Sequence, residues 1–265
     1  MKNIISLSGG KDSTAMLHLM LEKNEPIHSV IFFDTGWEFP QMIDHIHQVE
    51  KKTSIKVNII KPEKSFDYWM FQRPIIKKGT KDVHRIGNGW PSPMRRWCTR
   101  LKANALDKHF KKQGSDIVKC IGFAYDEKHR LDSKNVKESK IKLRFPLIEY
   151  GMTEKQAHAY CRVLGYDWGG LYDRFDRVSC FCCPLQRIGE LRKLRKIYPE
   201  LWGRMLKMGK SVPCHNRGFR MYDTVHDLEK RFEREDLQNS LFELEDYEKK
   251  EEDYNYKCGS FCERK

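Results

Sequence analysis

Short apolar runs alternate with longer mixed segments along the first part of the chain. Runs of strand length occur at residues 2–7, 28–34, 54–61 and 116–123. The segments that follow them predict helices over 13–23, 40–52, 64–72, 98–113 and 153–165. Strands that alternate with helices favour a parallel sheet with helices on both faces. We therefore expect an α/β fold of Rossmann-like type.

The connections and the C-terminal part follow a different pattern. Residues 74–93 are rich in Gly, Lys and Pro, and residues 125–142 are highly charged, so both are predicted to be loops. Beyond residue 186 the pattern predicts helices over 187–209 and 224–236, followed by a polar tail. We expect an α/β domain over 1–186 and a helical C-terminal region over 187–265.

The segment that follows the first strand has the composition of an anion site. Residues 8–14 read Ser-Gly-Gly-Lys-Asp-Ser-Thr. Glycine lacks the Cβ atom that would block a phosphate, and the backbone N–H groups of a helix start can point at one anion. Lys11 adds a positive charge, and Asp12 is expected to cap the following helix. The predicted anion-binding residues are Ser8, Gly9, Gly10, Lys11, Asp12, Ser13 and Thr14.

The second strand ends in a polar turn, Asp34-Thr35-Gly36. Ligands of parallel sheets bind at the carboxyl ends of the strands, where this turn and the glycine loop both lie. Asp34 or Thr35 could therefore approach a ribose, an adenine or a metal ion. A plain turn is the alternative, since Asp and Gly are common turn residues.

Nine cysteines in a chain of this kind favour metal or redox chemistry over a disulfide framework. Cys180 and Cys183 have the spacing with which two thiolates bind one iron–sulfur cluster or one zinc ion. Cys120 and Cys161 fall in a predicted strand and helix, and we interpret both as buried core thiols.

The charge balance is strongly basic. Lys and Arg number 50 and Asp and Glu 37, for a net charge of +13. This balance suits DNA, RNA or a phosphorylated nucleotide, although a well-solvated surface is the alternative. No apolar run approaches membrane-spanning length, so no membrane partner is expected. The N-terminus enters a strand without a signal-peptide pattern, which predicts a cytoplasmic location.

Together these motifs resemble a known family. Residues 8–14 resemble the pyrophosphate-binding loop (PP-loop) of the adenine nucleotide α-hydrolases. With the turn at 34–36, five segments in register resemble the phosphoadenosine-phosphosulfate (PAPS) reductase family over residues 4–186: 96–102, 122–130, 145–147, 171–173 and 180–184. The resemblance implies a Rossmann-like sheet of the HUP type, and it implies that Gly122 and Arg130 contact the nucleotide. Ala124 departs from the family, which often has Arg there.

The resemblance also implies a metal centre. Related iron–sulfur reductases bind a cluster through a tandem cysteine pair and a later Cys-x-x-Cys, and here Thr99 replaces one member of the pair. We expect a [4Fe-4S] cluster, with zinc as the alternative. The predicted ligands are Cys98, Cys180, Cys182 and Cys183, and Cys214 is the second candidate for the fourth position. Mg²⁺ could accompany the nucleotide.

The tail carries Cys258-Gly259 and Cys262. PAPS reductases have a nucleophilic cysteine in a similar C-terminal Cys-Gly motif. Cys258 is thus predicted to attack sulfur, with Cys262 resolving the product as a disulfide. Two incidental thiols in a polar tail, or a second zinc half-site, are the alternatives.

Three functions fit these motifs. The first is ATP-dependent adenylation and sulfur transfer to a nucleic acid, such as DNA or tRNA, or to a small acceptor, with a sulfur donor protein. The second is a PAPS or adenosine phosphosulfate reductase that releases sulfite with a thiol reductant. The third is a nucleic-acid-binding module without chemistry. In both enzyme hypotheses, sulfur transfer and reduction, Lys11 and Asp12 are predicted to be catalytic.

Overall fold

The computed structural model describes residues 1–114, 116–178, 180–212, 218–220 and 223–239. The chain forms two compact units that interleave in sequence. Unit 1 contains Met1–Ser65 and Thr99–Cys180, and unit 2 contains Phe66–Cys98 and Phe181–Lys265. The expected domain boundary after residue 186 stays a prediction.

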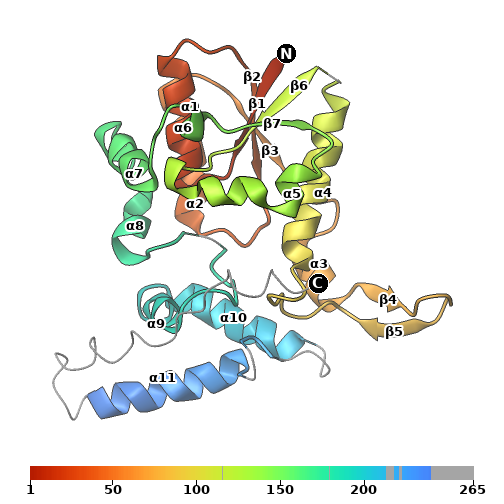
Figure 1. Cartoon of the computed structure of the whole chain (residues 1–265). Coiled ribbons are helices and arrows are strands. Elements are labelled where there is room, and N and C mark those ends of the chain that lie inside the picture. The colour runs from red at the N-terminus through yellow and green to blue at the C-terminus, as the bar shows by residue number, and fades with distance from the viewer. Residues whose placement is uncertain (115, 179, 213–217, 221–222, 240–265) are drawn as a thin grey trace. The chain divides into compact units, whose positions relative to one another are not determined.

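Unit 1 is built on a five-stranded, all-parallel sheet with the strand order β3-β2-β1-β6-β7 (Figure 1). Its strands are β1 Lys2–Leu7, β2 Ile27–Phe33, β3 Val57–Ile60, β6 Ile117–Cys120 and β7 Lys142–Arg144. In the central strand, Ile5 is in register with Val30 on one side and with Cys120 on the other. The chain moves outward from β1 in one direction and then crosses to β6 on the other side. The loop that follows β1 therefore lies at the switch point of the sheet, where ligands of such folds bind.

Both faces of the sheet are covered. Val30, Ile31, Phe32 and Phe33 of β2 are each at most 1% exposed. Because neighbouring side chains of a strand point to opposite faces, this run requires packing on both sides. Each such side chain stabilises the fold by about 1.5–3 kcal/mol. The expected α/β, Rossmann-like fold is confirmed.

The helical segments of unit 1 connect these strands (Figure 1). Its helices are α1 Lys11–Glu22, α2 Pro40–Thr53, α4 Trp97–Lys112 (whose first two residues belong to unit 2), α5 Lys134–Lys137, α6 Pro146–Glu149, α7 Glu154–Val163 and α8 Leu171–Arg174. The 3₁₀ segments are Tyr125–Asp132 and Trp168–Gly170.

The prediction of a loop over 125–142 is wrong, because this charged stretch is divided into short helical turns and the start of β7.

Helix α1 begins earlier than the sequence pattern predicts. Its N-cap is Gly10, in an extended conformation and without a side-chain cap bond. Asp12 lies inside the first turn, so its predicted role as the helix cap is wrong. The reason is local: the Asp12 carboxylate accepts hydrogen bonds from the Lys11 ammonium, and Ser13 closes the loop instead, donating to the Gly10 carbonyl.

Unit 2 contains a hairpin where the sequence predicts a loop. After α3 (Phe66–Phe71), β4 (Pro74–Ile76) and β5 (Val83–Ile86) form an antiparallel pair. The turn between them uses Gly79 at φ +83°, and the Thr80 N–H donates to the Lys77 carbonyl at 3.1 Å. The apolar residues of each strand are too few to give a clear alternating pattern, which is why the hairpin is not visible in the sequence.

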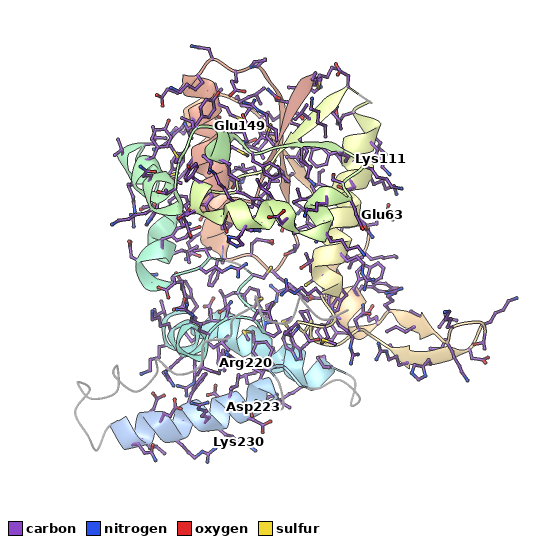
Figure 2. All side chains as sticks on the ribbon, in the orientation of Figure 1. Glu63, Lys111, Glu149, Arg220, Asp223 and Lys230 are labelled. Carbon is purple, nitrogen blue, oxygen red and sulfur yellow. The ribbon has the colours of Figure 1, made fainter. Side chains whose placement is uncertain are left out.

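The C-terminal part of unit 2 is helical, as predicted. Its helices are α9 Ile188–Ile197, α10 Pro199–Ser211 and α11 Val225–Asn239. The expected single helix over 187–209 divides at Pro199, because a proline ring restricts the preceding residue and removes an N–H donor. Ahead of α11, Arg220 and Asp223 form an isolated β-bridge (Figure 2). No helix among the described residues combines the length and apolar character needed to cross a membrane.

Candidate functional site

The glycine loop between β1 and α1 is shaped by two close approaches. Gly9 has φ +81°, and a Cβ atom there would lie 3.0 Å from the Met42 sulfur. A Cβ atom on Gly10 would lie 3.2 Å from the Tyr172 hydroxyl. The Gly9 carbonyl accepts a hydrogen bond from the Trp168 indole N–H at 2.8 Å. The loop is therefore held from outside by aromatic side chains that come more than 150 residues later.

Ser13 closes the loop from inside. Its Oγ accepts the Ser8 N–H at 3.1 Å and donates to the Gly10 carbonyl at 3.0 Å. The end of β6 packs directly behind this serine: a Cβ atom on Gly122 would lie 2.9 Å from the Cα and N atoms of Ser13. Real Cβ atoms do not approach backbone this closely, so Gly122 is required for the fit between the β6 end and the loop. Its expected contact with a nucleotide stays a prediction.

Lys11 lies at the centre of a charge cluster. The residue is 8% exposed, and its ammonium lies 3.1 Å from each Asp12 carboxylate oxygen and 2.5 Å from Glu154 Oε1. Burial raises the pKa of Asp12 above its ordinary value, against the opposing effect of Lys11, and the charges of Glu154 and Glu127 raise it further. One cation here faces two carboxylates, so an incoming phosphate must compete with both for Lys11.

Helix α7 brings Glu154 to this position. Thr153 caps the helix, with its Oγ1 accepting the Gln156 N–H, and the Gln156 side chain accepts the Thr153 N–H at 2.9 Å. The Glu154 N–H donates to an Asp126 carboxylate oxygen at 3.0 Å. Glu154 is not identifiable as a site residue from the sequence. Its local signal is the capping pattern Thr-x-x-Gln, which marks a helix start and carries no information about Lys11.

Tyr172 of α8 contacts the backbone of the loop. Its hydroxyl accepts the Lys11 N–H at 3.0 Å, and burial raises the pKa of this phenol above its usual range. The buried Cys161 thiol donates to the Lys11 carbonyl at 3.4 Å. Burial raises the pKa of Cys161 to about 12, as it does for Cys120. Both are buried, which confirms their interpretation as core thiols.

A histidine supports the loop from the core. His45 is 0% exposed, and its Nε2 lies 2.9 Å from the Thr14 hydroxyl. Its ring stacks on Trp168, with 4.6 Å between centroids. Burial lowers the pKa of His45 to about 3, so the ring is neutral. Thr14, predicted as an anion ligand, is also 0% exposed and directs its hydroxyl toward this histidine.

The turn after β2 forms the neighbouring wall. Asp34 accepts the Gly36 N–H at 2.8 Å and pairs with Lys61 at 3.6 Å. The Thr35 N–H donates to the Glu38 carboxylate at 3.0 Å, and the Thr35 hydroxyl donates to both Glu38 oxygens at 2.8 Å. Burial raises the pKa of Glu38. Glu38 is a further site residue that the sequence analysis does not identify.

Cys180 lies beside the same turn, with its sulfur 3.9 Å from the Thr35 hydroxyl oxygen. Because β1 and β2 are adjacent and parallel, their carboxyl ends share one edge of the sheet. A thiol and the glycine loop thus belong to the same edge of unit 1.

The other predicted metal ligands, Cys98, Cys182 and Cys183, belong to unit 2. Cys182 is 1% exposed, and Cys98 and Cys183 are half-buried. Thiolates of this kind suit a [4Fe-4S] cluster or zinc by their chemistry. Among the described residues, however, no group of three or more His, Cys, Asp or Glu side chains is placed to hold a metal ion. Cys214, Cys258 and Cys262 lie outside the described residues.

Arg130, the last predicted nucleotide ligand, lies in the 3₁₀ segment after β6. Its guanidinium donates to Glu127 at 2.8 Å and lies 3.8 Å from the centre of the Phe123 ring. The Ala124 N–H donates to the same Glu127 carboxylate at 3.3 Å.

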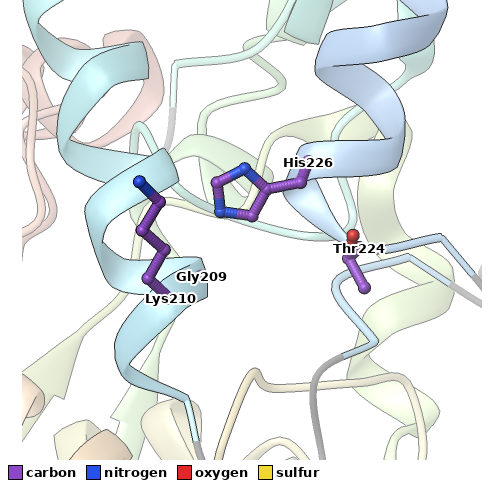
Figure 3. Close-up of a pocket in the computed structure, with 4 residues that line it drawn as sticks. All are labelled: Gly209, Lys210, Thr224 and His226. Atoms are coloured by element: carbon purple, nitrogen blue, oxygen red, sulfur yellow. The ribbon is translucent and has the colours of Figure 1, made fainter.

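Unit 2 has a separate cavity of about 330 Å³. It is lined by Gly209 and Lys210 of α10 and by Thr224 and His226 at the start of α11 (Figure 3). The His226 Nε2 atom is buried and has no hydrogen-bond partner. Among the described residues, none of those predicted from the sequence lines this cavity.

The fold and the loop define the class of the protein: an α/β protein of nucleotide-binding type, with a glycine loop and a helix start at the switch point of a parallel sheet. A family model described as the phosphoadenosine phosphosulfate reductase domain matches residues 2–186. The chain therefore belongs to the PAPS reductase family, and the resemblance inferred from its motifs is confirmed.

Curated relatives include two proteins of Methanocaldococcus jannaschii. The chain is 27% identical to the uncharacterized protein MJ0066 over 207 residues, with 75% of this chain and 39% of that protein covered. It is 28% identical to the uncharacterized protein MJ0973 over 214 residues, with 77% and 47% covered. The chain thus spans less than half the length of either relative. A crystal structure of phosphoadenylyl-sulfate (PAPS) reductase from Candida auris, in a phosphate complex, is similar at a TM-score of 0.46 and 18% identity, covering 68% of this chain and 82% of that one.

Proposed function

We propose that this protein uses ATP to adenylate an acceptor and then transfers sulfur to it. The observation that carries the proposal is the position of Cys180, 3.9 Å from Thr35, at the sheet edge that also carries the glycine loop. A sulfur-carrying group and a phosphate-binding loop at one edge suit a reaction in which sulfur replaces an activated oxygen.

The first half-reaction would take place at the loop. The N–H groups at the start of α1 and the Lys11 ammonium bind the phosphates of ATP. A carbonyl oxygen of the acceptor attacks the α-phosphorus, the bond to the β-phosphate oxygen breaks, and pyrophosphate leaves. Lys11 neutralises charge that develops on the leaving pyrophosphate, and Asp12 holds Lys11 in place.

The second half-reaction would use Cys180. An external donor protein that carries a cysteine persulfide transfers its outer sulfur to the Cys180 thiolate and is left as a thiol. The terminal sulfur of the Cys180 persulfide then attacks the adenylated carbon, while AMP leaves with the oxygen. An external thiol then cleaves the resulting disulfide, which releases the thiolated acceptor. In this scheme Cys180 is not a metal ligand. A metal centre would be held by Cys98, Cys182 and Cys183 of unit 2, and no part of the scheme depends on it.

A second candidate is reduction of PAPS or adenosine phosphosulfate. The family match and the Cys258-Gly259 motif favour it. The Cys258 thiolate would attack the sulfur of the phosphosulfate and expel the adenosine phosphate, and two electrons from an external thiol would release sulfite.

Product analysis separates the candidates. The anaerobically purified chain is incubated with ATP and a nucleic acid or small acceptor, or with PAPS and a thiol reductant. Pyrophosphate and AMP formed only with the acceptor support sulfur transfer, and sulfite supports reduction. If neither product forms while nucleic acid binds tightly, the chain is a binding module instead.

Cysteine variants test the assigned thiols. We expect Cys180→Ser to abolish formation of the thiolated product while pyrophosphate release persists, because adenylation does not need the thiol. Cys120→Ala changes a fully buried thiol in β6 and is the matched control. Loss of pyrophosphate release in Cys180→Ser alone would contradict the two-step scheme. Iron, sulfide and zinc analysis of the same preparations tests the proposed metal centre.

A further inference from the structure

The β4–β5 hairpin of unit 2 is strongly basic. Its fourteen residues, 73–86, include five Lys or Arg and a single acidic residue, Asp82. Three of the positive charges, Lys77, Lys78 and Lys81, lie in or beside the turn at the end of the hairpin. Figure 1 shows the two strands extending as an arm from the segment that follows α3.

The residues that the structure describes do not pair with the charges of the turn. Throughout the part of the chain that the structure describes, Lys77, Lys78 and Lys81 form no ion pair. Lys193 and Arg195 of α9, by contrast, pair with the carboxylates of Glu190 and Glu229. Unpaired ammonium groups on an exposed turn are available to an external polyanion.

One face of the hairpin also exposes apolar side chains. Ile76 and Val83 are in register, so both lie on the same face, and they are 48% and 55% exposed. Ile86 on the same strand is 51% exposed. The register shifts between Ile75 and Ile76, so that Ile75 pairs with Arg85; this half-buried pair lies on the opposite face. The ribbon therefore presents an apolar strip that ends in a cluster of positive charges.

We propose that the β4–β5 ribbon binds double-stranded DNA. Its charge is complementary to the phosphate backbone, and the major groove of B-form DNA, about 12 Å wide, admits a two-stranded ribbon. The apolar strip can contact thymine methyl groups and sugars inside the groove. The major groove of A-form RNA is too narrow for such entry. Residues 73–86 contain no Phe, Tyr or Trp, and His84 is their one aromatic side chain, so the ribbon offers less stacking surface than single-strand binders use.

This inference deepens the proposed function and rests on it for one consequence, that DNA is the acceptor of sulfur. Binding itself requires neither nucleotide nor turnover. A binding assay and a product assay can therefore fail independently of each other.

The test compares two triple variants of the full chain. Lys77→Gln, Lys78→Gln and Lys81→Gln together remove the cluster on the turn. Lys134→Gln, Lys137→Gln and Lys140→Gln remove three exposed lysines from α5 and the segment after it, and serve as the control of equal charge. Binding to a fluorescent DNA duplex is measured by anisotropy between about 50 and 200 mM salt.

We expect the ribbon variant to bind at least about ten-fold more weakly at intermediate salt, with the slope of log K against log salt reduced by about 3. The control should keep most of the affinity. The proposal is overturned if the wild-type chain does not bind the duplex, if both variants bind alike, or if single-stranded DNA or duplex RNA binds as tightly. Circular dichroism of both variants verifies that they are folded. If DNA binds as expected and no pyrophosphate forms, the proposed reaction fails and the ribbon assignment stands.

Discussion

At the scale of single residues, the candidate site consists of groups that restrain Lys11. Asp12 and Glu154 both contact its ammonium, and Tyr172 accepts its N–H. Of these, only Asp12 is adjacent in sequence and was identified from the loop motif. Glu154 and Tyr172 come from α7 and α8, and nothing in their local sequence indicates that the fold returns them to the loop.

Glu154 is expected to oppose phosphate binding. Its carboxylate competes for Lys11 and repels an approaching anion, so Glu154→Gln should tighten the binding of ATP or PAPS. An ion pair with one half-exposed partner is worth about 0.2–1 kcal/mol, which corresponds to roughly a 1.4- to fivefold change in Kd. Isothermal titration calorimetry measures the change. Glu138→Gln, at an exposed glutamate of unit 1, is the control, and equal or weaker binding by Glu154→Gln would refute the competition.

His45 is expected to make stability depend on pH. Its pKa in the folded chain is about 3, against about 6.5 in an unfolded chain. Below pH 6.5 the unfolded state therefore binds more protons, and stability falls as the pH falls from 6.5 toward 3. At pH 5 the loss is about 2 kcal/mol relative to neutral pH.

Replacement of His45 tests whether its protonation causes the pH dependence of stability. His45→Gln should lower stability at neutral pH and flatten its dependence between pH 7 and 5, as measured by urea denaturation. His47→Gln, on the exposed side of α2, is the control for replacing a histidine of the same helix. A pH dependence that survives in His45→Gln would assign it to other groups, such as His18, whose pKa burial also lowers.

At the scale of elements, the site depends on how closely the end of β6 approaches α1. Gly122→Ala would place a methyl group 2.9 Å from the Ser13 backbone, and neither backbone can move without disturbing the loop. We expect a loss of about 1–3 kcal/mol in stability and weaker nucleotide binding. Gly203→Ala in α10 meets nothing within 4 Å and should be neutral or stabilising, because alanine favours helix. Thermal melts and titrations of both variants compare the effects, and equal behaviour would show that the approach is not critical.

Elements with strong patterns were predictable, and elements with weak patterns were not. The buried run of β2 and the helix after the glycine loop follow directly from apolar runs and glycine placement. The β4–β5 hairpin is not predictable from the pattern, because each strand has only three or four residues and its pairing is set by the turn at Gly79. The break at Pro199 was missed although proline marks such breaks, because apolar periodicity continues on both sides of it.

At the scale of the whole molecule, the sequence reveals the family and the sheet, and it reveals less about the site. The loop after β1 and the turn after β2 are each a single short stretch of sequence, so the residues of each can be identified from a short motif. Trp168, Tyr172 and Glu154 reach the loop only because the chain crosses to β6 and β7 and then returns through α7 and α8. Contacts of such sequence separation need the three-dimensional path, which no local pattern contains.

The hydrogen bond between the Lys11 N–H and the Tyr172 hydroxyl has a consequence for ligand binding at the glycine loop. Backbone donors in the first turn of a helix have no partner inside the helix, and a glycine-rich loop around them would otherwise collapse or fluctuate. Here one such donor is already satisfied by the protein. The conformational entropy of the loop is then lost when the chain folds and not when a ligand binds. Less of the binding free energy is therefore needed to order the loop.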